Sequence, residues 1–288
     1  MNVIKNRRIY SFISLAIIIV GIGTMAFRGL NYGIDFTGGT IITVNSDKFI
    51  PEKEVKAITD KLDSNMSVVY SGKDKTDVII KSTLNIKNKE MTAISDEFNE
   101  KFDIDNKNIT AKIVGPSIGK ETRDKAILST LIATALMLAY ITFRFEFTLG
   151  VSAIVALIHD VLITISVYAI FNLPVNSSFI AAILTIVGYS INDTIVIFDK
   201  IRETMKFNSR QDLEGLINTS IKSSLRRTIN TTLTTLTAVV VLYIVGVEDI
   251  RVLALPLMVG MLSGTYSSIF IAPSIWYDIK SLKTRTAK

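Results

Sequence analysis

The sequence contains no cysteine and only one histidine, His159, among its 288 residues. Without cysteine a chain cannot form a disulfide, a redox pair or a thiolate nucleophile, and a lone histidine cannot complete a Cys/His metal site. We therefore expect neither a bound metal ion nor any other cofactor.

Polar residues are also few for a soluble protein of this length, since 49% of the residues are hydrophobic and the mean hydropathy is +0.41. The apolar residues gather into runs of about twenty, the length that a helix needs to cross roughly 30 Å of hydrocarbon. The first run follows basic residues, as in a signal peptide, but it is longer and has no small-residue cleavage site, which favours an uncleaved anchor. Six runs predict six membrane-spanning helices: residues 9–27, 126–143, 149–171, 178–198, 228–247 and 252–276.

The net charge of +6 is distributed unevenly along the chain. Residues 28–124 hold 15 Lys/Arg and 16 Asp/Glu, whereas the remainder holds 17 and 10, mostly beside the hydrophobic runs. Basic residues next to membrane spans mark the cytoplasmic side, so both termini and the loop 199–227 are predicted to be cytoplasmic. Nucleic-acid binding is not expected, because it requires a basic patch on a soluble face.

This orientation predicts four parts of the chain. They are an N-terminal segment with the first span (1–28), an extracytoplasmic domain (29–124), spans two to six with the cytoplasmic loop 199–227 (125–279), and a basic cytoplasmic tail (280–288). The short connections 144–148 and 172–177 are predicted to be turns.

The extracytoplasmic domain shows alternating strand and helix patterns. Runs rich in β-branched residues predict strands at 40–45, 66–71, 77–83 and 109–115. Apolar residues at helical spacing predict helices at 51–63 and 88–102, the second capped by Asn88. The order βαββαβ predicts a ferredoxin-like α+β domain.

Two aspartates lie within the apolar runs. Asp160 follows His159 in the middle of the third run, and Asp193 lies in the inner part of the fourth. A carboxylate at bilayer depth costs about 2.5–3.5 kcal/mol on insertion scales, so it usually faces the bundle interior or a polar cavity. Both are candidate functional groups. For both, the alternative is a helix–helix hydrogen bond or hydration near the membrane surface.

The fifth run opens with a polar stripe, in which Arg227, Thr231 and Thr234 share one helix face. A buried carboxyl group tends to keep its proton, whereas a nearby guanidinium favours its release. We therefore predict a proton relay formed by Asp193 and Arg227, with Asp160 as a third member. The predicted supporting polar residues are His159, Asn192, Thr231 and Thr234.

The sixth run carries small residues at four-residue spacing, namely Gly260, Gly264 and Ser268, with Ser263 and Ser267 beside them. Small residues on one face allow two membrane helices to pack closely. This pattern predicts a packing role without chemistry.

Four longer motifs resemble those of the SecF branch of the SecD/SecF family of bacterial protein-export membrane proteins. They are YGIDFTGGT at 32–40, GYSINDTIVIFDKIRE at 188–203, RTINTT at 227–232 and GTYSSIFIA at 264–272. They occur in the order found in the family, and the resemblance covers essentially the whole chain. The family-motif residues of the first segment are Gly33, Asp35, Gly38 and Gly39.

The resemblance implies a six-span half of a transporter of the resistance–nodulation–division (RND) type, paired with SecD as a separate chain. It implies an auxiliary role in the Sec translocase, in which the pair uses the proton motive force to promote late export across the bacterial cytoplasmic membrane. Asp193 and Arg227 match the family positions tied to proton passage, and Asp160 matches an HD motif. Other implied partners are the SecYEG channel, the SecA motor, YajC, YidC, the translocating preprotein and membrane lipids.

Two other functions are compatible with the same residues. A half-size RND-type exporter of lipids or small molecules would be favoured by a deep apolar pocket in the outer domain. An intramembrane protease would need two aspartates facing each other, or a Ser/His pair. The expected protein is a transport subunit that is not an enzyme in the bond-breaking sense.

Overall fold

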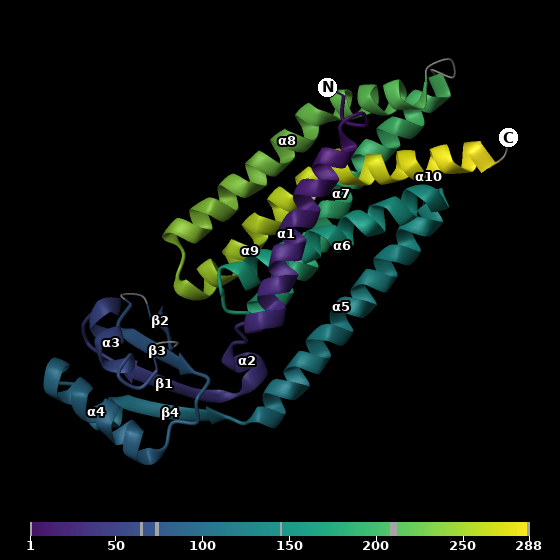
Figure 1. Cartoon of the computed structure of the whole chain (residues 1–288). Helices are drawn as coiled ribbons and strands as arrows, with labels where there is room; N and C mark the ends of the chain where they lie inside the picture. Colours follow the sequence, from purple (N-terminus) through teal and green to yellow (C-terminus); the bar gives the residue numbers. More distant parts are fainter. Residues whose placement is uncertain (1, 64–65, 73–74, 145, 208–211, 287–288) are drawn as a thin grey trace.

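Six long apolar helices form a bundle with a small sheet domain at one end (Figure 1). The structure is a computed structural model that describes residues 2–63, 66–72, 75–144, 146–207 and 212–286. Among these residues, six helices are long and apolar enough to cross a membrane. They are α1 (Arg7–Arg28), α5 (Pro116–Arg144), α6 (Phe147–Ile170), α7 (Ser177–Phe207), α8 (Leu213–Val245), and a sixth span made of α9 (Glu248–Tyr266), the π-helical turn η2 (Ser267–Ile271) and α10 (Ala272–Thr286). This architecture confirms a multi-pass α-helical membrane protein.

Helix α7 packs against α6, α8 and α9. The bundle core is apolar and includes Ile197, Phe198 and Trp276, each at most 2% exposed. Helix α1 packs mainly on α6, whereas α5 runs along the outside and leaves most of its apolar surface uncovered (Figure 1). An apolar helix left uncovered by its own chain is suited to face lipid or another membrane protein.

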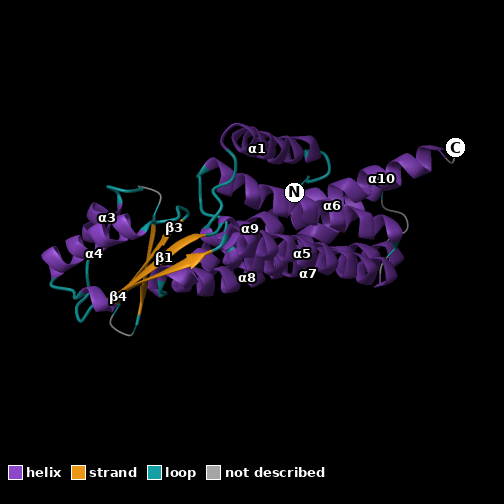
Figure 2. Cartoon of the chain, turned by 90° about the horizontal axis from the view of Figure 1, so that it is seen from below, coloured by secondary structure: helices purple, strands orange, loops and turns teal. Residues whose placement is uncertain are grey.

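The sheet domain lies between α1 and α5 in the sequence and is called the outer domain below. It has the predicted βαββαβ order. Its strands β1 (Gly39–Asn45), β2 (Ser67–Ser71), β3 (Asp77–Ser82) and β4 (Ile109–Val114) form an antiparallel sheet in the order β2-β3-β1-β4. Helices α3 (Glu52–Thr59) and α4 (Asn88–Phe102) cover one face and bury the apolar side chains of β1 and β3 (Figure 2). The ferredoxin-like prediction is confirmed. Lys87, rather than Asn88, occupies the N-cap position of α4.

Several helices extend beyond the apolar runs that predicted them. Helix α5 starts at Pro116, so the predicted domain boundary at 124/125 falls inside a continuous helix. Helices α7 and α8 continue into the predicted loop 199–227, of which residues 208–211 lie outside the described residues. Residues 287–288 of the predicted tail also lie outside them. Hydropathy marks only the membrane-embedded part of a helix, whereas backbone hydrogen bonding continues through polar residues.

The N-terminal residues are packed into the end of the bundle remote from the outer domain. Val3 and Ile4 are fully buried, and the Ile4 amide donates to the side chain of Asn218 on α8. Arg7 forms a salt bridge of 2.9 Å with Asp278 on α10. These contacts tie α1 to the fifth and sixth spans at this end.

Candidate functional site

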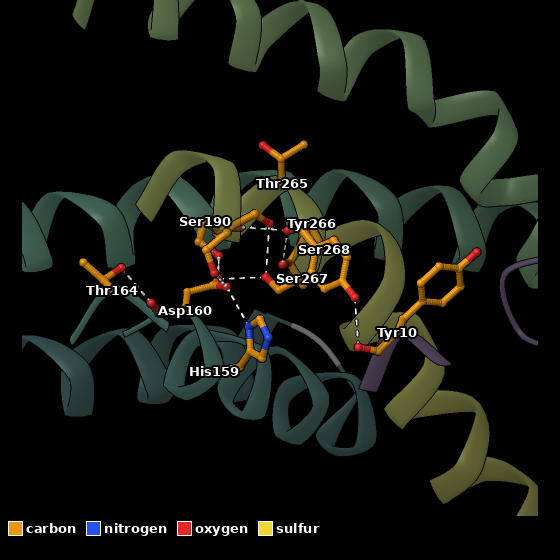
Figure 3. A network of polar contacts seen from close by, with 12 residues as sticks. Tyr10, His159, Asp160, Thr164, Ser190, Thr265, Tyr266, Ser267 and Ser268 are labelled. Carbon is orange, nitrogen blue, oxygen red and sulfur yellow. Dashed lines mark hydrogen bonds and ion pairs between the residues drawn. The ribbon is translucent and has the colours of Figure 1, made fainter. Parts of the chain in front are cut away.

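Asp160 lies on α6 at the centre of a polar cluster (Figure 3). Its side chain is fully buried and accepts hydrogen bonds from three serine hydroxyls. Ser190 of α7 and Ser267 of η2 donate to Oδ2 at 2.6 and 2.7 Å, and Ser263 of α9 donates to Oδ1 at 2.8 Å. Because its donors come from both the fourth and the sixth spans, the Asp160 carboxylate joins three helices.

The ring of His159 lies beside this carboxylate. Its Nδ1 is 3.0 Å from Oδ1 of Asp160, within hydrogen-bonding distance. Its Nε2 is buried and has no hydrogen-bond partner among the described residues. The ring stacks on Tyr266, whose hydroxyl donates to the backbone carbonyl of Tyr10 on α1 (Figure 3). This chain of contacts connects the Asp160 cluster to the first span.

Small residues allow the sixth span to approach α7 closely. A Cβ atom added at Gly260 would collide with Ile186, and one at Gly264 would lie 2.9 Å from Cβ of Ser190. One turn later, Ser268 is within hydrogen-bonding distance of Thr194 at 2.8 Å. A π-helical turn inserts an extra residue per turn, and here η2 presents adjacent serines to two partners, Asp160 and Thr194.

Asp193 lies on α7 and is 3% exposed, but its polar surroundings are sparse. Its carboxylate accepts one long hydrogen bond of 3.4 Å from Thr232 of α8. The same hydroxyl is 2.6 Å from that of Thr265 on α9. The hydroxyls of Tyr189 and Thr228 are buried and have no partner among the described residues. The polar groups in this part of the bundle are therefore incompletely paired.

Arg227 lies on α8 near enough for its charge to act on the Asp193 carboxylate, although no salt bridge joins the two within the described part of the chain. Its side chain is exposed and borders an open cavity of about 540 Å³ between α7 and α8, toward the end remote from the outer domain. The polar lining residues include Asn192, Asp199, Lys200, Glu203, Ser223 and Arg227.

Among the described residues, neither threonine of the predicted stripe forms a hydrogen bond with Asp193. The hydroxyls of Thr231 and Thr234 bond to carbonyls of their own helix, and Thr234 is exposed. Asn192, next to Asp193 in the sequence, is exposed and lines the cavity beside Arg227. Thr232, one residue from the predicted stripe, is the hydroxyl that contacts the carboxylate.

The first family-motif segment lies where the outer domain meets the bundle. Gly33 donates its amide to Val175 in the α6–α7 loop at 2.8 Å, and the Asp35 carboxylate accepts from the Ser177 amide at the start of α7 at 2.8 Å. Gly38 and Gly39 have positive φ values of 76° and 147°, a region that favours glycine. Backbone at the end of β4 and in the β4–α5 connection lies against Gly38, and backbone at the end of β3 lies against Gly39.

Sequence reasoning selected both carboxylates but not their partners. Ser263 and Ser267 were predicted only to permit close packing, yet they donate to Asp160. Ser190 and Thr265 gave no separate signal, because isolated hydroxyl residues are common in membrane helices and usually bond to their own backbone. Finding these partners requires knowing which faces of the neighbouring helices pack together, and the sequence alone does not give this.

Comparisons with known proteins agree on one family. A family model described as "Protein export membrane protein SecD/SecF, C-terminal" matches residues 94–282, and the "SecD/SecF GG Motif" model matches residues 23–48. The chain is 35% identical over 295 residues to the protein translocase subunit SecF of Helicobacter pylori strain J99, covering 96% of this chain and 88% of that protein.

Fused relatives are also similar. The chain is 36% identical over 276 residues to the protein translocase subunit SecDF of Bacillus subtilis strain 168, covering 94% of this chain and 37% of that protein. The crystal structure of SecDF from Thermus thermophilus, described as a translocon-associated membrane protein, superposes with a TM-score of 0.80 at 31% identity. That match covers 98% of this chain and 39% of the other. The chain thus spans about two fifths of the SecDF proteins that it matches.

Proposed function

Because the chain belongs to the SecD/SecF family of protein-export membrane proteins, we propose that it is an auxiliary subunit of the bacterial Sec translocase. In this role it uses the proton motive force, together with SecD, to promote late export of preproteins across the cytoplasmic membrane. The observation that carries the proton-driven part is the buried Asp193 carboxylate, which has one long hydrogen bond and a nearby exposed arginine.

An uncovered polar face supports the pairing with SecD. On α7, Thr185, Gly188 and Asn192 are exposed at helical spacing, and on α8 Asn230 and Thr234 are exposed. Amide side chains at membrane depth are unfavourable against lipid and usually face other helices. A second six-span subunit would cover this face. The SecDF relatives, in which a SecF-like part is fused to more chain, are consistent with this arrangement.

The proposed mechanism starts at Asp193. Protonation removes the negative charge that attracts Arg227 and weakens the contact with Thr232. The interfaces between α7, α8 and the sixth span then shift, and the outer domain moves with them. One charge crossing about 150 mV releases roughly 3.5 kcal/mol, enough to change a two-state population several-hundred-fold.

The open cavity next to Arg227 lies between α7 and α8 toward one end of the bundle, and we place the proton route from Asp193 through it. With both termini in the cytoplasm, as the basic segments indicate, the cavity opens toward the cytoplasm and the sheet domain lies outside. A proton released from Asp193 leaves through this cavity. SecYEG, SecA, YajC and YidC would act upstream or alongside, and the outer domain would contact the emerging preprotein directly or through SecD.

The site differs from what the two alternatives require. In a protease of the paired-aspartate type the two carboxylates share one site, whereas Asp160 and Asp193 each have their own hydroxyl partners on different helices. An exporter would be favoured by a deep apolar pocket in the outer domain. A cavity of about 440 Å³ there is lined largely by polar loop residues such as Asp47 and Lys48, and a more open hollow of about 660 Å³ is lined mainly by charged residues of α3 such as Lys53 and Lys56. Both observations favour a proton-driven transport subunit.

The decisive experiment is Asp193→Asn, measured as proton-gradient-dependent preprotein export in membranes that contain SecD and the translocase. We expect the gradient-dependent part to be lost, because asparagine cannot exchange a proton. The matched control is Asp124→Asn, since Asp124 is an exposed aspartate on α5 that does not line the cavity beside Arg227. Wild-type, gradient-dependent export by Asp193→Asn would refute the proposed function.

A further inference from the structure

The outer domain and the proton-site helix are joined by a direct polar contact. The carboxylate of Asp35 accepts a hydrogen bond from the backbone amide of Ser177, the first residue of α7. Asn176 adds a second cap, because its side chain accepts from the amide of Phe179. The unpaired amides of a helix N-terminus and its dipole both favour a carboxylate there. The segment that leads into the outer domain thus supplies a cap for α7.

Two backbone contacts beside Asp35 strengthen the same link. The Gly33 amide donates to the Val175 carbonyl, and the Val175 amide donates to the Asn31 carbonyl, each at 2.8 Å. These bonds form a short parallel bridge between the segment after α1 and the α6–α7 loop. We call this set of contacts, from Asn31, Gly33 and Asp35 to residues 175–177, the latch.

We propose that Asp35 is a coupling residue, through which a displacement of α7 at the proton site moves the outer domain. This inference rests on the proposed function, because it concerns how protonation of Asp193 reaches the domain outside the membrane. Asp35 acts by positioning and takes no part in proton transfer.

The length of α7 makes such coupling physically reasonable. Ser177 and Asp193 lie sixteen residues apart on one uninterrupted helix, about 24 Å along its axis. A helix packed on three sides moves as a rigid element, so a shift or rotation at Asp193 also displaces Ser177. The latch passes this displacement to the segment that holds Asp35.

The other side of the latch is rigidly attached to the outer domain. Asp35 lies in α2 (Ile34–Thr37), which packs on the start of α5. A Cβ atom at Gly119 would lie 2.7 Å from the Phe36 carbonyl, so the two helices touch closely. Gly38 then leads directly into β1, one of the two central strands of the sheet. The latch, α2 and the sheet therefore move together.

There is also room for movement at this junction. A crevice of about 230 Å³ lies between the open face of the sheet and the outer end of the bundle. Its lining includes Asp35 and Asn176 of the latch region, Val69 and Lys81 of the sheet, and Val252 of α9. The sheet can therefore move relative to α9 by opening or closing this crevice, while the latch keeps the sheet connected to α7.

The test separates coupling from folding by comparing two substitutions in the full chain bound to its SecD partner. Asp35→Ala removes the acceptor, whereas Asp35→Asn keeps an acceptor of the same shape that caps helices about equally well. Asp105→Ala is the matched control, because Asp105 caps a short helix of the outer domain away from the bundle by accepting from the Lys107 amide.

Movement is measured by pulsed electron paramagnetic resonance between spin labels at Thr110→Cys on β4 and Val155→Cys on α6. Both positions are exposed in the chain, and the absence of native cysteine leaves these as its only labelling sites. We expect Asp193→Asn to shift the distance distribution when Asp35 is present. With Asp35→Ala the shift disappears, and export falls at least about five-fold, the ratio equivalent to the ~1 kcal/mol contributed by a capping side chain. Asp35→Asn and Asp105→Ala retain both responses.

Each other outcome decides against one of the two proposals. If Asp193→Asn shifts the distance equally with and without Asp35, or produces no shift in either background, the coupling role is refuted. It is likewise refuted if Asp35→Ala exports at the wild-type rate, or if Asp35→Asn fails as completely as Asp35→Ala. If instead export does not respond to Asp193→Asn, the proposed function fails whatever the spin labels report.

Discussion

Asp160 and Asp193 are buried carboxylates on neighbouring helices of one bundle, yet their surroundings differ in kind. Asp160 accepts hydrogen bonds from three serine hydroxyls on two other spans, at 2.6 to 2.8 Å. Asp193 accepts one hydrogen bond of 3.4 Å, from Thr232. The buried hydroxyls of Tyr189, one turn from Asp193, and of Thr228, one turn from Thr232, have no partner among the described residues. A fully paired polar group fixes a structure, whereas an incompletely paired one can exchange partners at lower cost.

The difference assigns separate roles to the two residues. We infer that Asp160 holds α6, α7 and the sixth span in register, and that Asp193 is the group whose proton changes. The two sites meet at the sixth span, where Ser263 and Ser267 contact Asp160 while Thr265 contacts Thr232. We therefore expect the Asp160 cluster, which lies on the other face of the same turn, to limit how the sixth span moves when Asp193 gains or loses its proton.

The largest expected effect is on stability, from Asp160→Ala. Removing the carboxylate leaves the Ser190 and Ser263 hydroxyls and Nδ1 of His159 without their partner, at about 1–3 kcal/mol for each group that stays unsatisfied. Ser267 keeps a second acceptor, the Gly264 carbonyl. We expect a loss of about 3–5 kcal/mol in the free energy of unfolding, measured by denaturant titration of the purified protein in detergent. Asp193→Ala is the comparison and is expected to cost less than about 1 kcal/mol.

This contrast is open to a clear contradiction. Equal losses for the two alanine variants would mean that the number of donors does not distinguish the sites. A larger loss for Asp193→Ala would reverse the assignment and make Asp193 the structural residue.

The next effect concerns packing on the two faces of α7. Gly260 lies against Ile186, so Gly260→Ala should overpack this contact and cost about 1–3 kcal/mol. Nothing lies within 4 Å of a Cβ atom at Gly188, so Gly188→Ala should stabilise the isolated chain by up to about 1 kcal/mol through helix propensity. Unfolding titrations of both variants measure this difference.

The Gly188→Ala variant also tests whether SecD binds to the uncovered polar face of α7. Gly188 lies on the uncovered polar face, so the same alanine should weaken co-purification with SecD if a partner helix packs there. Unchanged SecD recovery with Gly188→Ala, or with the bulkier Gly188→Leu, would place the interface elsewhere.

The comparison also shows what the sequence alone can and cannot determine. The strands of the outer domain end within one or two residues of their predicted limits, because alternation is a local pattern. Both carboxylates were found because a charge in an apolar run is conspicuous. Their partners were not, since Thr231 and Thr232 look equivalent in sequence, and only the orientation of α8 against α7 decides which one contacts Asp193.

The smallest expected effect tests this last distinction. Thr232→Val keeps the side-chain shape but removes the hydroxyl between Asp193 and Thr265. Hydrogen bonds between membrane helices contribute about 0.6 kcal/mol on average, so we expect a stability loss near that value, together with a clear reduction in gradient-dependent export. Thr231→Val is the matched control, because its hydroxyl bonds only to the Arg227 carbonyl of its own helix, and it should leave export unchanged. If Thr231→Val impaired export and Thr232→Val did not, the stripe predicted from sequence would be the functional face of α8, and Asp193 would act without the threonine that now contacts it.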